Sequence, residues 1–511
     1  MPNNQVTTSV GMNFPVAKLS RHWLFLSFLA LYGALLLSQL NHGLASGDAH
    51  GIVRTTQTLV ENHRLEVSRP PGHPTTEFYL FGAAGWILKQ GFGHKFDDQT
   101  YLALQSLAAL ATLVVFYELL CRLGTKRWRA LLATLCLAFS AQYFANAIDG
   151  EEFNFALLFL LISVRLLIVP PDSASALGRL FLSIFCFALA TGCRPEIVFA
   201  GLIFPTYCLL HPKLGWKYAI ATLPIQAATI FLIWLPVIFI GVKAPYTAGM
   251  NLRESILGGG YRLIFQCFTL PVFLLLCWIL IRALRDCRKR IQDSFPGNFI
   301  FVASCIVVVI FFVVFFRHAS KPAHVLVVVP FLLLLAMKHS NILLLGLTVA
   351  TLIGCFVNID IFQDRQLVRP FLVPGSYFQA AWQKPHYKLA YLRELPHQCE
   401  DRPTVIIANA AQWDVEYHLA RGSFSAREEI LADTNKPGLP AFFPRENDAC
   451  ILLPRDGAYE TRLLENWKRK GYSFKMDALL YRTLFARYNV TASLTNSASL
   501  GDISFSLFSI K

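Results

Sequence analysis

The sequence predicts an all-α membrane protein of about 11 transmembrane helices, followed by a small α/β domain. Hydrophobic residues make up 55% of the 511 residues, and charged residues only 15%. Soluble domains usually carry about 25% charged residues, so much of this surface must face something other than water. Apolar runs such as 23–40 and 299–316 approach the roughly 20 residues that cross a hydrocarbon core.

Apolar runs recur along most of the chain. The predicted spans lie at 23–40, 101–121, 129–147, 153–169, 179–192, 197–210, 217–241, 262–284, 299–316, 323–337 and 341–357. The first run is longer than the core of about 7–15 residues in a cleaved signal peptide. We therefore interpret it as a retained first helix.

Loops rich in Lys and Arg alternate along the chain with loops that contain few of them. The net charge is +14, and Lys and Arg gather in loops such as 122–129 and 282–290, on the side of the N-terminus. Positive residues that flank apolar spans indicate a cytoplasmic membrane surface and argue against a nucleic-acid partner. The positive-inside rule predicts a multi-pass protein with a cytoplasmic N-terminus. We expect the inner membrane of a bacterial cell, with the ER membrane as the alternative. An odd number of spans then places the C-terminal region on the periplasmic, extracytoplasmic face.

Composition divides the chain into four regions. They are a cytoplasmic tail at 1–22, a transmembrane domain at 23–357 with the outside loop 41–100, a linker at 358–384, and an extracytoplasmic α/β domain at 385–511. In the last region, 404–408 and 450–453 resemble short buried strands, while 412–420 and 459–470 have the charge and spacing of helices.

The outside loop 41–100 is too long for a passive connector. Apolar residues at helical spacing in 49–62 predict an amphipathic helix along the membrane interface. The sequence RPPG at 69–72 must be extended or turned. Pro74 can open a second short helix at 75–90, whose aromatic residues suit the headgroup level.

Ionisable residues gather at the span ends on the side opposite the N-terminus. Near a membrane such groups are costly unless they are paired or hydrated, so they are candidates for function. These residues are Asp48, Asp149, Glu151, Glu152, Arg194, Glu196, Arg317, His318, Lys321 and His324.

A structural role is the alternative for each of these groups. Asp48 is also a good helix N-cap, and the acidic run 149–152 can cap the fourth span. Arg194 can reach a lipid phosphate, with Glu196 in the first turn of the next helix. The basic hairpin 317–324 lies where the positive-inside rule expects few cations, and an anionic ligand explains it better than a structural loop does.

Short motifs occur in a fixed order along 20–360. They are GDAHG at 47–51, LVEN at 59–62, RPPGHP at 69–74, DGEE at 149–152, TGCRPE at 191–196, and the segment from FRH at 316–318 to Pro330. This order resembles the polyprenyl-phosphate-sugar-dependent type-C glycosyltransferases (GT-C). That group includes protein O-mannosyltransferases and the lipid A aminoarabinose transferase.

The resemblance implies an inverting membrane glycosyltransferase that moves a hexose or pentose from a polyprenyl-phosphate donor to an acceptor hydroxyl on the extracytoplasmic face. The partners are then the lipid bilayer, the lipid-linked donor and a glycan, lipid or protein acceptor that the sequence does not identify. The attacking hydroxyl needs a base, and the implied carboxylates are Asp48 with Asp149, Glu151 or Glu152 as helper. The leaving phosphate needs positive charge, and the implied ligands are Arg194, Arg317 and Lys321. Further site candidates are His50, His73, Glu196, His318 and His324.

The sequence assigns no cofactor, and it leaves two alternative functions to weigh against the transferase. A divalent metal would fit acidic groups that converge with His50, but the sequence has no recognised spacing of His and Cys ligands, and no cofactor is assigned. The alternative functions are a transporter or flippase for a lipid-linked or anionic substrate, and a non-catalytic scaffold. A transporter would place charged or broken sites near the midplane of repeated halves. Here the ionisable groups lie at span ends and no repeat is visible, which favours the transferase.

Overall fold

The structure is a computed structural model of the 511-residue chain. It describes residues 22–40, 47–68, 71–149, 152–168, 176–241, 252–285, 295–317, 322–337, 341–363, 366–374, 404–407, 428–431, 450–455, 492–500 and 503–510.

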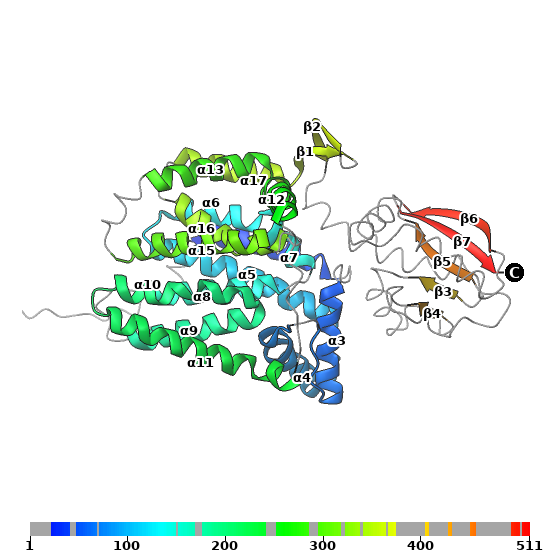
Figure 1. The fold of residues 1–511 in the computed structure, drawn as a ribbon, viewed down its shortest axis with the longest axis horizontal. Coiled ribbons are helices and arrows are strands. Elements are labelled where there is room, and N and C mark those ends of the chain that lie inside the picture. Colours follow the sequence, from blue (N-terminus) through cyan, green and yellow to red (C-terminus); the bar gives the residue numbers. More distant parts are fainter. Residues whose placement is uncertain are drawn as a thin grey trace, which may run out of the picture.

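Apolar helices make up most of the described chain (Figure 1). The α-helices are α2 (Trp23–Leu37), α3 (Gly47–Asn62), α4 (Phe81–Phe92), α5 (Asp98–Arg122), α6 (Arg127–Ala138), α7 (Ala141–Asp149), α8 (Phe153–Leu167), α9 (Ala176–Cys193), α10 (Ile203–Leu210), α11 (Trp216–Ile240), α12 (Leu252–Tyr261), α13 (Leu270–Arg285), α15 (Gly297–Arg317), α16 (Val328–Ala336) and α17 (Asn341–Gly354). Shorter π or 3-10 pieces are η3 (Thr75–Leu80), η4 (Pro195–Leu202), η5 (Arg262–Cys267) and η6 (Pro322–Val325).

Several helices are suited to cross a membrane. Within the described residues, 4 helices are long and apolar enough, namely α5, α9, α11 and α15, and 2 bent pairs raise the number to 6. Shorter apolar helices, including α2 and α17, accompany them. Large apolar side chains such as Leu31, Phe239 and Ile342 are exposed, as expected where a helix faces lipid. The chain is a multi-pass, all-α membrane protein in this region.

Two segments predicted as straight spans are bent in the structure. The span predicted at 129–147 corresponds to α6 and α7, which are bent by 62° relative to each other. The span predicted at 262–284 falls in a pair of helical segments that are bent by 101°. At the second bend Thr269 has a positive φ of 63°, and Pro271 stands at the second residue of α13. A proline cannot continue a preceding helix but is well tolerated in the first turn of a new one. The helix therefore ends and restarts there.

Both helices predicted within 41–100 are present. The first is α3, and the second is η3 followed directly by α4, which ends at Phe92 and is capped by Gly93 in the left-handed conformation. On α3, the apolar side chains of Ile52, Val53 and Val60 are buried, which is the pattern of an amphipathic helix. In Figure 1, α3 lies across one end of the helical bundle.

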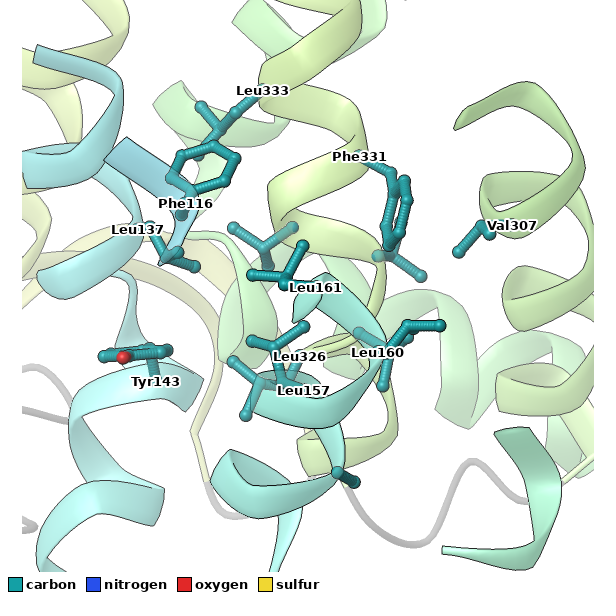
Figure 2. Close-up of a cluster of buried hydrophobic side chains, with 14 of the residues drawn as sticks. Phe116, Leu137, Tyr143, Leu157, Leu160, Leu161, Val307, Leu326, Phe331 and Leu333 are labelled. Atoms are coloured by element: carbon teal, nitrogen blue, oxygen red, sulfur yellow. The ribbon is translucent and has the colours of Figure 1, made fainter. Parts of the chain in front are cut away.

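A hydrophobic core joins helices that are distant in the sequence. Figure 2 shows Leu157 and Leu161 of α8 beside Leu326, which follows η6, and near Phe116 of α5 and Phe331 of α16. All of these side chains are at most 2% exposed. Because α8 also packs along α9, this core fixes the ends of the helices where the ionisable residues lie.

Strands follow the last helix. Strands β1 (Val357–Gln363) and β2 (Gln366–Pro374) form an antiparallel pair within the segment that the sequence assigned to a linker. A second sheet has the order β4-β3-β5-β7-β6, with elements at Glu428–Leu431, Thr404–Ile407, Cys450–Arg455, Ile503–Ile510 and Ala492–Leu500. The two strands predicted at 404–408 and 450–453 are β3 and β5, which pair in parallel. The predicted helices at 412–420 and 459–470 lie outside the described residues.

Gly192, near the end of α9, allows the closest helix contact beside the ionisable residues. A Cβ atom there would overlap Thr75 of η3 and would lie 2.7 Å from Cγ2 of Ile233 on α11. We expect Gly192→Ala to lower the free energy of unfolding by about 1–3 kcal/mol, the usual cost of overpacking. Thermal unfolding of the purified protein measures this.

Gly178→Ala in the same helix is the matched control, since a Cβ there meets nothing within 4 Å among the described residues. In an exposed helix position Ala is more stable than Gly by up to about 1 kcal/mol. Equal melting of the two variants would show that the close contact at Gly192 is absent.

Candidate active site

Five ionisable side chains form one buried cluster. They are His73 before η3, Glu152 before α8, Arg194 after α9, Glu196 in η4, and His324 in η6. Each is at most 8% exposed. Four separate parts of the sequence therefore bring two carboxylates, two imidazoles and one guanidinium together.

Arg194 lies at the centre of this cluster. Its Nη1 atom is 3.2 Å from Oε1 of Glu152, and its Nε atom is 3.1 Å from Oε1 of Glu196. The guanidinium carbon lies 3.5 Å from the centre of the Phe153 ring. Arg can serve all three partners at once, because its planar group donates in several directions and stacks on aromatic faces. It holds the two carboxylates near each other.

Each imidazole contacts one of these carboxylates. Nδ1 of His73 is 2.7 Å from the carbonyl oxygen of Cys193, so Nδ1 carries a proton and donates it. Nε2 of His73 lies 3.1 Å from Oε1 of Glu152, and an ionic contact there needs a second proton on the ring. On the other side, Nδ1 of His324 lies 2.9 Å from Oε1 of Glu196.

The composition of the cluster suits proton movement. Two carboxylates and Arg194 give a charge of −1, and protonation of both imidazoles changes it to +1. Imidazoles are the side chains that change charge most readily near neutral pH. The cluster can thus accept or release protons while the pairing of Arg194 is kept.

The other predicted site residues either lie on described helices or fall outside the described residues. Asp48 is the second residue of α3, within its first turn, and Asp149 is the last residue of α7. His50 is buried on α3, and Arg317 is exposed at the end of α15. Glu151, His318 and Lys321 lie outside the described residues.

A groove of about 910 Å³ begins at the cluster. Glu196, His324, Pro71 and Arg317 belong to its wall, and the rest of the wall is mainly apolar side chains of η4, α11 and α15. These include Val198, Phe199, Leu202, Leu223, Val309 and Val313. Because a helix rises 1.5 Å per residue, the apolar wall on α15 extends about 12 Å from Arg317. The groove therefore has a charged end and a long hydrocarbon-like part.

Glu77, in η3, belongs to the same region and was not singled out by the sequence analysis. It is 1% exposed, accepts hydrogen bonds from the backbone N–H and the hydroxyl of Ser68, and lies 3.4 Å from the backbone N of His73. Burial raises the pKa of Glu77 to about 7, and the nearby charge of Glu152 acts in the same direction. The only sequence signal was a lone acid in the aromatic run after Pro74.

The raised pKa of Glu77 predicts a dependence of stability on pH. Because the native pKa is above the ordinary 4.5, the stability contribution is complete below about pH 4.5 and is lost as the pH rises to about 7. The loss is about 3 kcal/mol at most, at 1.36 kcal/mol per pKa unit. Thermal unfolding between pH 4.5 and 8 should show wild-type protein losing stability relative to Glu77→Gln. Parallel curves for the two proteins would contradict the raised pKa.

The described helical region has the fold of a type-C glycosyltransferase, as the sequence resemblance predicted. It matches the crystal structure of ArnT from Cupriavidus metallidurans bound to undecaprenyl phosphate, with a TM-score of 0.55 and 11% sequence identity. The match covers 96% of this chain and 98% of that chain. No protein-family model and no curated protein matches the sequence. At this identity the comparison defines the fold.

Proposed function

We propose that this protein is a membrane glycosyltransferase that moves a sugar from a polyprenyl-phosphate donor to an acceptor hydroxyl, with inversion at the anomeric carbon. One observation carries the proposal: the apolar groove and the buried charge cluster share Glu196 and His324. A ligand with an anionic head and a long hydrocarbon chain would match the charged end and the apolar part of the groove. The ArnT structure with the same fold contains undecaprenyl phosphate, which is a lipid of this class.

The lipid chain would occupy the apolar part of the groove. Its walls on η4 and α15 expose Phe199, Val309 and Val313, which exclude water from a hydrocarbon ligand. The phosphate would lie at the charged end, where Arg317 supplies a cation and His324 a second donor. Arg194 supports this end through Glu196, whose position it fixes. Lys321 is a further proposed phosphate ligand.

The transfer step is a displacement at the anomeric carbon. The acceptor oxygen forms a bond to that carbon while the bond to the phosphate oxygen breaks, and the electron pair leaves with the lipid phosphate. Asp48 would take the proton of the acceptor hydroxyl, with Glu152 or another member of the 149–152 run as helper. Positive charge at the phosphate stabilises the negative charge that develops there. The buried imidazoles can then pass protons between the carboxylates and solvent.

The remaining organisation follows the sequence. We infer about 11 membrane helices, a cytoplasmic N-terminus, and an extracytoplasmic α/β domain at 385–511. The position of α3 across the bundle end supports an interfacial location for the first loop. With this topology the donor and its glycan, lipid or protein acceptor meet at the extracytoplasmic face of the inner membrane.

A lipid-linked-substrate flippase is the second candidate. The two bent helix pairs favour it, because transporters often build sites from interrupted helices. The candidates differ in chemistry: a transferase consumes the donor, whereas a flippase moves it unchanged across the bilayer.

Blocking the groove tests the donor site. Val313→Trp puts a large ring into the groove, and we expect it to weaken binding of undecaprenyl phosphate by about tenfold or more, which corresponds to about 1.4 kcal/mol. Native mass spectrometry of the detergent-solubilised protein with added lipid gives the affinity. Val349→Trp on α17 is the matched control, since Val349 is exposed and lies outside this groove. Equal affinities in the two variants would place the lipid elsewhere.

A further inference from the structure

Glu77 ties together the two ends of a turn beside the charge cluster. Its Oε1 atom accepts from the backbone N of Ser68 at 3.2 Å and from the Ser68 hydroxyl, and its Oε2 atom faces the backbone N of His73 at 3.4 Å. Ser68 and His73 flank the segment 69–72. One carboxyl group thus contacts the residues on both sides of this segment.

The His73 end of the turn is held at several points. The carbonyl oxygen of His73 accepts from the backbone N of Glu77 at 2.9 Å and from the Thr76 hydroxyl at 3.1 Å. The His73 ring is fixed separately by the carbonyl of Cys193. With the backbone and the ring both held, Nε2 of His73 is placed 3.1 Å from Oε1 of Glu152.

The same turn reaches the groove. Pro71 belongs to the groove wall, and Gly72 has a φ of +92°, which favours glycine. A Cβ at Gly72 would lie 2.8 Å from Val67 and 3.1 Å from Val237, so the turn sits tightly against α11. A shift of this turn would move both the His73 contact and the groove wall.

Stability alone does not explain an acid at this position. Burial and the charge of Glu152 act against the charged form of Glu77, while its hydrogen bonds from Ser68 and His73 favour that form. An acid retained at such a cost has a geometric use here, because its two oxygens can accept from both ends of the turn.

We propose that Glu77 is a positioning residue for transfer, which holds Ser68 and His73 in place so that His73 meets Glu152 and Pro71 keeps its position in the groove wall. This inference rests on the proposed glycosyltransferase function. Glu77 acts through His73 and Pro71 and touches neither sugar nor phosphate. Its loss should therefore lower the rate of transfer through His73 and weaken the binding of the donor through Pro71.

The test compares Glu77→Leu, Glu77→Gln and the control Glu66→Leu. Glu66 lies in the same segment but pairs with Arg64 near the surface. We expect Glu77→Leu to lower kcat by about tenfold or more and to raise the KM for the donor, and Glu66→Leu to behave like wild type. Glu77→Gln keeps one acceptor oxygen and should recover part of kcat. Hydrogen exchange should become faster at Ser68 and His73 in Glu77→Leu, with α5 unchanged.

Three results would overturn this role for Glu77: wild-type turnover in Glu77→Leu, a Gln variant no better than Leu, or faster exchange throughout the bundle. The last result would make Glu77 a residue of general stability. If wild-type protein consumes no polyprenyl-phosphate sugar, the proposed function itself fails. That outcome is distinct from an active wild type whose rate does not depend on Glu77.

Discussion

Replacement of Asp48 by Asn is expected to lower sugar transfer by about 10²- to 10⁴-fold, the usual contribution of a general base. Asp48 lies in the first turn of α3, where an acid also interacts favourably with the helix dipole. Asn keeps the size and hydrogen-bonding capacity of Asp but cannot take a proton from the acceptor. Loss of turnover without loss of melting temperature therefore separates the catalytic role from the structural one.

The control for Asp48→Asn is Asp98→Asn. Asp98 is the first residue of α5 and likewise an acid in a first helical turn. Both changes remove one negative charge from a helix N-terminus, and the lost interaction with the helix dipole costs below about 1 kcal/mol in each. Turnover should survive in Asp98→Asn. If Asp48→Asn also turns over at the wild-type rate, another residue is the base.

The largest expected effect on stability comes from Arg194→Gln. Arg194 is buried and contacts both Glu152 and Glu196, so its loss leaves two buried carboxylates without their cation. Removing one partner of a buried ion pair costs about 3–5 kcal/mol. Arg194→Lys should lie between wild type and Gln, because one ammonium cannot reproduce two directed contacts.

The matched control for Arg194 is Arg165→Gln. Arg165 also donates to a carboxylate, Glu118, at 2.6 and 2.8 Å. That pair is only partly buried, so its loss should cost about 1 kcal/mol or less. Adding Glu152→Gln to Arg194→Gln should restore part of the lost stability, a coupling that a double-mutant cycle measures. Equal costs for Arg194→Gln and Arg165→Gln would contradict the central position of Arg194.

The membrane region could be predicted from hydropathy because each span is a long, locally encoded apolar run. The bends were missed because hydropathy averages over a whole apolar run and does not register a break inside it, even where Pro271 gives a local signal near Thr269. The helices of the first loop were predictable from one apolar stripe on α3 and from Pro74. The β1–β2 pair was missed because its strands lie beyond the last apolar run, in a segment with polar interruptions.

The sequence could predict which residues gather at the candidate site, but not which of them contact each other. The predicted topology alone gathers Glu152, Arg194, Glu196 and His324 at one end of the bundle. Successive spans alternate in direction, and these residues lie at span ends on the same side of the membrane. Which carboxylate meets which cation depends on packing between distant helices. Glu77 gave little signal, since one acid in an aromatic run resembles a surface residue. Its burial depends on contacts with Ser68 and His73, which only the folded structure shows.

The most direct test of the central claim is donor consumption by purified protein. Wild-type and Asp48→Asn proteins in lipid nanodiscs would be given polyprenyl-phosphate hexoses and pentoses with a crude envelope extract as acceptor, and the lipids would be followed by mass spectrometry. We expect wild-type protein to convert at least one donor to free polyprenyl phosphate, with an inverted glycosidic bond in the product and little conversion by the variant. Recovery of every donor intact with wild-type protein, or its passage across the bilayer unchanged, would contradict the proposed glycosyltransferase.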